Sequence, residues 1–105
     1  MEKPRLAIIV PCFNEELCVK STVEQLLNVL NKLVSDEKIK PDSYIYLVDD
    51  GSVDKTWEII EEFHNKNKHI KGLKFVRNFG NQKALLAGLD CVRAIGCDCA
   101  VSIDA

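Results

Sequence analysis

Four short apolar segments alternate with three longer segments of helical periodicity, and this alternation constrains the fold more than any other feature. The predicted elements are, in order, strand 6–10, helix 15–34, strand 44–48, helix 54–65, strand 73–76, helix 81–95 and strand 97–103. Strands that are apolar at consecutive positions are typical of a parallel sheet covered by helices on both faces. Right-handed helical crossovers are the usual connection between such strands. We therefore predict an α/β fold of three layers, α/β/α, with a mainly parallel sheet.

The composition describes a single small globular domain. The chain has 105 residues, 47% of them hydrophobic, which is enough for a substantial core. Its 14 basic and 16 acidic residues give a formal net charge of −2 without a basic block, which argues against a nucleic-acid partner. The apolar run at residues 6–10 is too short for a membrane span or for the core of a signal peptide.

The cysteines indicate a reducing environment. Their number is odd and no C-x-x-C pair occurs, so a zinc site or a disulfide framework is not expected. We interpret them as small apolar side chains and expect a cytoplasmic protein. His64 and His69 lack the spacing of metal ligands, and we expect them at the surface.

Polar segments follow the predicted strands and carry the candidate functional residues. These segments are residues 11–16, 49–52, 77–80 and 104–105. In open parallel sheets, ligands bind outside the carboxyl ends of the strands. We therefore expect several carboxylates, an aromatic ring and an arginine to converge on one edge of the sheet.

Structural and functional interpretations stay open for these segments. Asp49 and Asp50 could form a turn with Gly51, or could accept hydrogen bonds from the N–H edge of a base and from ribose hydroxyls. Glu15 could simply favour the start of a helix. Phe13 could belong to the core, or its ring could stack on a flat ligand.

Glycine and aspartate positions allow further hypotheses. Gly80 either ends a turn or lets a phosphate approach the N–H groups at the start of a helix. Gly88 lies inside a predicted helix, and we attribute it to close helix–sheet packing. Asp104 closes a strand that we expect to be buried, where its carboxylate is well placed to hold Mg²⁺ or Mn²⁺. One carboxylate is not a complete site, so other ligands would come from a bound nucleotide or from beyond Ala105.

Three common motifs are missing from the sequence. No G-x-G-x-x-G follows the first predicted strand, which argues against a dinucleotide cofactor. Neither a P-loop nor the G-x-S-x-G turn of α/β-hydrolases occurs.

Four segments together resemble the N-terminal half of a family 2 glycosyltransferase with the GT-A fold. They are residues 9–16 (Ile-Val-Pro-Cys-Phe-Asn-Glu-Glu), 48–52 (Val-Asp-Asp-Gly-Ser), 77–80 (Arg-Asn-Phe-Gly) and 102–105 (Ser-Ile-Asp-Ala). Residues 77–90 are also similar to the polyprenyl-phosphate sugar transferases, such as bactoprenol glucosyltransferase and dolichol-phosphate mannose synthase. Each motif alone is weak, but four in this order are specific. The resemblance implies a Rossmann-like nucleotide-binding half of a GT-A fold.

The resemblance also implies roles for individual residues. The first-strand motif that holds the base and ribose corresponds to Pro11, Phe13 and Glu15, with Phe13 where the family usually has tyrosine. Asp50 corresponds to the carboxylate that reads the base, and Asp49 supports it. The metal- and diphosphate-binding D-x-D motif begins at Asp104 and Ala105, and a loop near the donor carries Arg77 and Gly80.

For the intact protein, the resemblance implies transfer of a sugar from a nucleotide-sugar donor, such as UDP-glucose, to a polyprenyl phosphate with inversion. The implied cofactor is Mg²⁺ or Mn²⁺, and the implied location is the inner face of the cell membrane. Residues 1–105 would be the nucleotide-sugar-binding half, ending inside D-x-D and inactive alone. The catalytic base and membrane helices would lie beyond it. An unpaired strand edge would then favour self-association.

Other classes stay possible at this point. A phospho-acceptor receiver module also places an acidic pair after an apolar strand, but that pair follows the first strand of a receiver. A sugar nucleotidyltransferase would need a basic, glycine-rich loop after the first strand. A domain that binds a nucleotide sugar without turnover is the third alternative.

Overall fold

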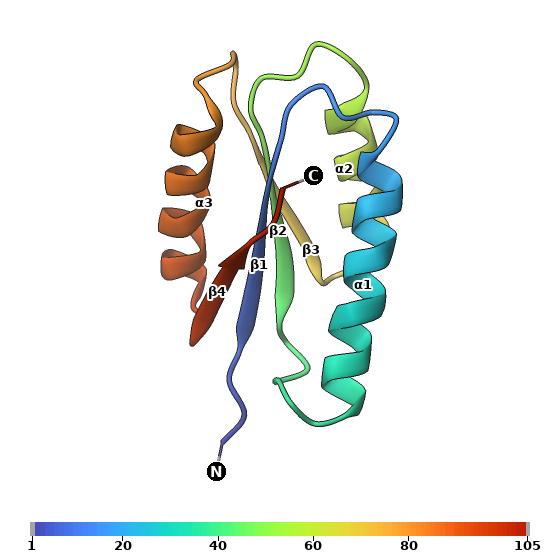
Figure 1. Cartoon of the computed structure of the whole chain (residues 1–105), viewed down its shortest axis with the longest axis vertical. Coiled ribbons are helices and arrows are strands. Elements are labelled where there is room, and N and C mark those ends of the chain that lie inside the picture. The colour runs from blue at the N-terminus through green and yellow to red at the C-terminus, as the bar shows by residue number, and fades with distance from the viewer. Residues whose placement is uncertain (1, 105) are drawn as a thin grey trace.

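A computed structural model describes residues 2–104 as a single α/β unit. Its elements are β1 (Leu6–Cys12), α1 (Val19–Ser35), β2 (Tyr44–Asp49), α2 (Thr56–Lys66), β3 (Ile70–Lys74), α3 (Asn81–Ile95) and β4 (Cys99–Ser102). The four strands are parallel in the order β3-β2-β1-β4. Helix α3 covers one face of the sheet, and α1 and α2 cover the other (Figure 1). The predicted three-layer fold is confirmed.

The central strands are buried on both faces, as their continuous apolar runs predict. Every residue of β1 and β2 is buried. Side chains alternate between the faces, so that Ile8 and Val10 pack with α1 and α2, while Ala7 and Ile9 pack with α3. Gly88 confirms the packing explanation, because an added Cβ would lie 2.7 Å from Ile9 Cγ2.

Several predicted boundaries are wrong, and β1 runs through Pro11 to Cys12 instead of ending at residue 10. Helix α1 begins at Val19 instead of residue 15, because residues 13–18 form turns and Asn14 has a φ of 52°. Strand β3 runs over residues 70–74 instead of 73–76, since Ile70 is fully buried beside Ile45 whereas Val76 is 94% exposed.

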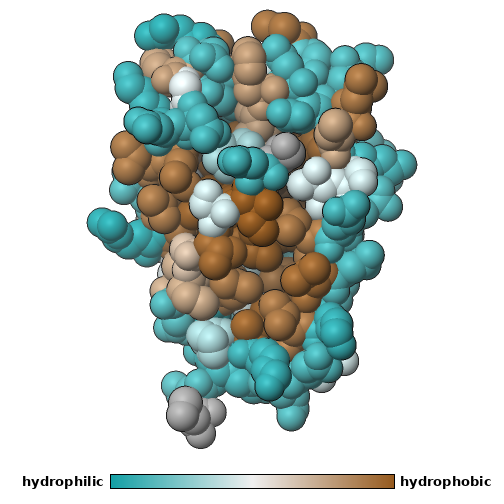
Figure 2. Space-filling model, in the orientation of Figure 1, coloured by the Kyte–Doolittle hydropathy of each residue, from teal (hydrophilic) through white to brown (hydrophobic). Residues whose placement is uncertain are grey.

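The prediction that the last strand is buried is also wrong. Strand β4 covers only residues 99–102, pairs with β1 alone and is exposed along its whole length. Val101 is 45% exposed and Ile103 37%. Figure 2 shows an apolar surface in the middle of the face where Figure 1 places β4 in front. An apolar run therefore predicts a strand here, but its position at the sheet edge decides the burial.

None of the helices within residues 2–104 is long and apolar enough to cross a membrane. The five cysteines are free thiols, of which Cys12 is buried and Cys18 and Cys99 are exposed.

Candidate functional site

An open hollow of about 530 Å³ lies at the carboxyl ends of the strands. Its lining comes from β1 and the loop after it, from the end of β2, from the start of α3 and from the residues after β4: Pro11, Cys12, Phe13, Glu15, Asp50, Asn78, Gly80, Asn81 and Asp104. The structure thus brings together most of the residues that the sequence singles out. Asp49 and Arg77 do not line the hollow, and Ala105 lies outside the described residues.

Three lining residues were not predicted, namely Cys12, Asn78 and Asn81. Each lies next to a predicted residue, so motif spacing alone offered a signal for them. Their side chains carry no charge, and nothing in the sequence distinguishes them from neighbouring turn or core positions.

Asp50 connects the end of β2 to the loop between β3 and α3. Its carboxylate, 3% exposed, accepts hydrogen bonds from Phe79 N (2.8 Å), Gly80 N (3.0 Å) and Asn78 Nδ2 (3.1 Å). A carboxylate has about four acceptor positions. These three bonds leave one acceptor position of Asp50, which lines the hollow, without a partner among the described residues.

Asp49 points to a different loop and is fully buried. Its Oδ1 accepts hydrogen bonds from the hydroxyl and the N–H of Ser52, the latter at 3.2 Å, so the turn interpretation applies to this residue. Its Oδ2 has no hydrogen-bond partner among the described residues. Asp49 thus binds within its own loop, between β2 and α2, whereas Asp50 binds the neighbouring loop between β3 and α3.

Gly51 brings the loops after β2 and β3 into close contact. Its φ is 73°, and an added Cβ would lie 2.1 Å from the carbonyl carbon of Arg77. Only glycine fits at this position without moving the Arg77 backbone. The Arg77 guanidinium itself lies 4.2 Å from the centre of the Phe79 ring, which accounts for its place outside the lining of the hollow.

The wall of the hollow formed by the end of β1 includes the Phe13 ring and the Cys12 thiol. Phe13 is 42% exposed at the end of the strand, and the buried Cys12 thiol donates to Val10 O over 3.4 Å. Burial, and then the charges of Asp49 and Glu15, raise the pKa of Cys12 to about 12. The thiol therefore stays protonated at neutral pH and lines the hollow as a small apolar group.

Asp104 reaches the hollow by extending the pairing of β4 with β1. The Ile103 N–H donates to Ile9 O at 3.0 Å, and Ile9 pairs with Ser102 in the strand register. Continuing that register places Asp104 beside Pro11, and both line the hollow. No group of three potential metal ligands occurs within residues 2–104. Asp104 supplies one exposed carboxylate, which fits Mg²⁺ or Mn²⁺ if phosphate oxygens and water complete the coordination.

The sequence of residues 7–100 matches the model for glycosyl transferase family 2. The chain belongs to this family. It is 48% identical over 103 residues to the uncharacterized glycosyltransferase YkoT of Bacillus subtilis, and the alignment covers 98% of this chain and 30% of that relative. It is 35% identical over 88 residues to the bactoprenol glucosyl transferase of Shigella phage SfX, covering 82% of this chain and 26% of that relative. The chain thus spans less than a third of these relatives.

Solved structures place this family 2 chain among GT-A glycosyltransferases. S. aureus TarS 1–349 in complex with UDP matches with a TM-score of 0.66 and 27% identity, over 95% of this chain and 27% of TarS 1–349. The Pyrobaculum calidifontis mannosyltransferase PcManGT, in complex with GDP-Man and Mn²⁺, matches with a TM-score of 0.71 over 99% of this chain and 28% of PcManGT. At 21% identity, that second likeness supports the fold alone. Family membership sets the receiver module aside.

Proposed function

We propose that residues 1–105 form the nucleotide-sugar-binding half of a glycosyltransferase. The observation that carries this proposal is the shared hollow, where Phe13, Asp50 and Asp104 from three different strands line one cavity. These residues are 37 and 54 positions apart in the sequence, so only the parallel sheet brings them together. Ligand sites of open α/β sheets lie at this edge.

Each lining residue has a chemical role in this proposal. The half-exposed Phe13 ring offers a face on which the base stacks. The remaining acceptor position of Asp50 takes an N–H from the base, and Glu15 and Pro11 border the ribose. The start of α3 at Gly80 and Asn81 faces the same hollow, and the partial positive charge of a helix N-terminus favours a diphosphate there.

Asp104 is the residue that would hold a divalent cation against the diphosphate. When bound, Mg²⁺ or Mn²⁺ neutralises the charge that develops on the leaving nucleoside diphosphate. The support for a cation is the exposed carboxylate at the rim of the hollow, whose oxygens are ligands that Mg²⁺ and Mn²⁺ prefer.

We propose a polyprenyl phosphate as the acceptor and a UDP-sugar as the donor. The support is the likeness to bactoprenol glucosyl transferases and to TarS with UDP bound. In this reaction, an oxygen of the acceptor phosphate attacks the anomeric carbon with inversion. The bond from that carbon to the diphosphate oxygen breaks, and its electron pair leaves with the diphosphate. We assign no catalytic base within residues 1–105, and a lipid acceptor would place the reaction at the inner face of the membrane.

Calorimetry on the 105-residue chain tests the nucleotide site directly. UDP and GDP are titrated with Mn²⁺, with Mg²⁺ and with EDTA, after circular dichroism has shown that the chain is folded. We expect metal-dependent binding of one nucleotide, and its loss in Asp104→Asn. A folded chain that binds neither nucleotide with either metal would contradict the proposal.

Binding without turnover is the alternative that the described residues leave open, because they contain no group of three potential metal ligands. Incubation of the intact protein with radiolabelled UDP-glucose, Mn²⁺ and undecaprenyl phosphate separates the two, because residues 1–105 alone are expected to be inactive. Radioactive lipid in the organic phase supports transfer, and its absence beside measurable UDP binding supports the alternative.

A further inference from the structure

The loop between β1 and α1 carries Phe13 and Glu15 into the hollow on an irregular backbone. Asn14 has a φ of 52°, a left-handed conformation that is uncommon for residues other than glycine. The loop lies ahead of the first helical turn, where N–H groups lack partners from the helix itself. Its shape must therefore be held by contacts from another segment.

The segment that holds it is the loop between β2 and α2. Three consecutive N–H groups of the first loop donate to three alternate side chains of the second: Asn14 N to Ser52 Oγ (2.8 Å), Glu15 N to Thr56 Oγ1 (2.8 Å) and Glu16 N to Asp54 Oδ2 (3.2 Å). A fourth bond runs in the opposite direction, from Val53 N to Asn14 Oδ1 (2.9 Å). We call Ser52, Asp54 and Thr56 the loop latch.

Two carboxylates orient the hydroxyls of the latch. A hydroxyl has one proton to donate. Ser52 donates its proton to the buried Asp49, and Thr56 donates to Asp54 Oδ1 at 2.5 Å. The lone pairs of both hydroxyl oxygens are therefore left for the N–H groups of Asn14 and Glu15. This arrangement gives Asp49 a structural purpose although it does not line the hollow.

The ionisation of Asp54 is consistent with this geometry. Partial burial acts to raise its pKa, but hydrogen bonds from the Thr56 hydroxyl, Thr56 N–H and Glu16 N–H together lower the pKa below its usual value. The carboxylate is thus charged at neutral pH, which strengthens the bonds that it accepts.

We propose that Ser52, Asp54 and Thr56 are positioning residues that pre-set Phe13 and Glu15 for the donor nucleotide. None of the three lines the hollow, so their effect on binding acts through the backbone of residues 14–16. The inference rests on the proposed function, because it concerns the same site. A loop that must order itself on binding lowers affinity without any lost ligand contact.

Thr56→Val tests the latch, because it keeps the shape of the side chain and removes the hydroxyl. Amide hydrogen exchange, followed by NMR without nucleotide, should show a protected Glu15 N–H in the original chain and in Thr56→Ser. We expect that protection to fall by about tenfold or more in Thr56→Val, since the Glu15 N–H loses the hydroxyl that accepts its hydrogen bond and exchanges with solvent. Thr22→Val, in helix α1, is the matched control and should leave Glu15 unchanged.

Nucleotide affinity is the second readout. With Mn²⁺ and whichever of UDP or GDP binds, the Kd should rise about tenfold in Thr56→Val, because the released backbone must be ordered again on binding. The Kd should return to the value of the original chain in Thr56→Ser and should not change in Thr22→Val. If Thr56→Val does not fold, Ser52→Ala makes the same test from the other anchor of the loop.

The two readouts separate the outcomes. An unprotected Glu15 N–H in the original chain would contradict the latch itself. If Thr56→Val loses protection of the Glu15 N–H but keeps its nucleotide affinity, the positioning role is overturned. The latch would then only stabilise the contact between the two loops. If the original chain binds no nucleotide while Glu15 stays protected, the proposed function fails and the positioning role fails with it, although the latch exists.

Discussion

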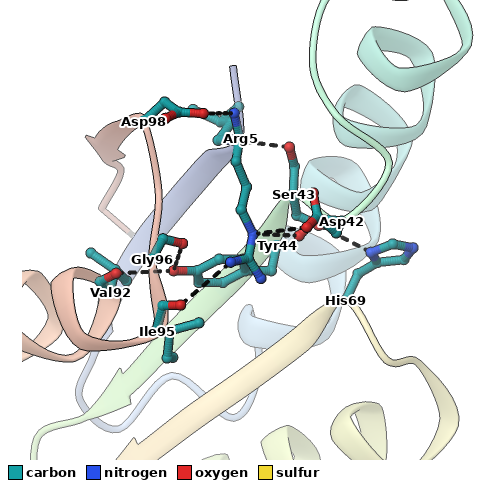
Figure 3. Close-up of polar contacts among 10 residues, drawn as sticks. Arg5, Asp42, Ser43, Tyr44, His69, Val92, Ile95, Gly96 and Asp98 are labelled. Atoms are coloured by element: carbon teal, nitrogen blue, oxygen red, sulfur yellow. Dashed lines mark hydrogen bonds and ion pairs between the residues drawn. The ribbon is translucent and has the colours of Figure 1, made fainter. Parts of the chain in front are cut away.

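The two ends of the sheet are both rich in polar side chains, but they use them differently. At the amino ends of the strands, side chains bind backbone groups and close the chain on itself. Arg5 lies at the centre of this end (Figure 3). Its guanidinium donates to Asp42 O (3.1 Å) and Ile95 O (3.4 Å), and its backbone N–H donates to Asp98 Oδ2 (2.7 Å).

Tyr44 and His69 continue the pattern at the amino end. The Tyr44 hydroxyl lies 3.1 Å from Gly96 O, and the Arg5 guanidinium lies over the Tyr44 ring at 5.0 Å (Figure 3). His69 Nδ1 lies 3.0 Å from Ser43 O, so it has a structural contact and is not merely a surface residue. A hollow of about 260 Å³ exists here too, but Arg5, Tyr44 and His69 in its lining already have partners in the chain.

The carboxyl end is organised in the opposite way. There the buried residues Asp50 and Thr56 bind neighbouring loops, and Asp49 binds Ser52 in its own loop. Phe13 and Asp104 stay exposed at the hollow. The comparison teaches that a polar cluster indicates a ligand site when some of its groups are held in place but left without partners. A cluster whose groups mostly bind other parts of the chain stabilises the fold.

Gly51→Ala should have the largest effect, and it acts only at the carboxyl end. The added Cβ would collide with the Arg77 backbone at 2.1 Å, on top of an unfavourable φ of 73°. We expect a loss of at least about 3 kcal/mol in the free energy of unfolding, measured with urea. Gly80→Ala is the matched control, since its φ is 102° but nothing lies within 4 Å of an added Cβ. Equal losses in both variants would show that the loop contact is not tight.

Asp50→Asn should reduce both stability and binding. The amide would keep one acceptor oxygen but would turn an NH₂ group toward the N–H of Phe79 or Gly80. We expect unfolding to be easier by about 2 kcal/mol, the usual penalty for buried groups without partners. Nucleotide binding should weaken by more than about tenfold, because the loop moves and the acceptor for the base is lost. Unchanged affinity in calorimetry would remove Asp50 from the site.

Burial of the Cys12 thiol at the carboxyl end should make the free energy of unfolding fall at alkaline pH. Its pKa is about 12 in the folded chain, against a usual value of 9.0, so the unfolded chain releases the thiol proton first. Stability from this group is therefore complete below pH 9 and is lost as the pH rises from 9 to 12. At pH 10 the expected loss is about 1.4 kcal/mol, and urea unfolding of Cys12→Ala should show a correspondingly flatter profile. If the free energy of unfolding fell equally with pH in the original chain and in Cys12→Ala, the prediction would be refuted.

Tyr44→Phe should have the smallest effect and sharpens the comparison from the amino end. It removes the hydroxyl contacts with the carbonyl oxygens of Val92 and Gly96 and keeps the ring. We expect a loss of about 1 kcal/mol in urea unfolding, typical of one removed hydrogen-bonding group. Nucleotide affinity should not change, because Tyr44 lies at the other end of the sheet. A weaker affinity would mean that the two ends are coupled.

Much of the fold was predictable, because hydrophobic periodicity is a local property of the chain. The alternation of strands and helices follows from it, and so does the close packing at Gly88. The burial of β4 was not predictable, since an apolar run does not state how many neighbours the strand will have. The start of α1 was missed because the N–H groups of Asn14 and Glu15 donate hydrogen bonds to Ser52 and Thr56, which hold these residues in a loop.

The sequence by itself determined the layered α/β architecture, the edge of the sheet where polar residues gather, and the resemblance to family 2 glycosyltransferases. Only the tertiary structure decided the strand order β3-β2-β1-β4 and the separate tasks of Asp49 and Asp50. The reason is physical. Periodicity and turn chemistry act between residues close in the chain and are enough to pair Asp49 with Ser52, whereas the partners of Asp50 are set by which loops the sheet brings side by side.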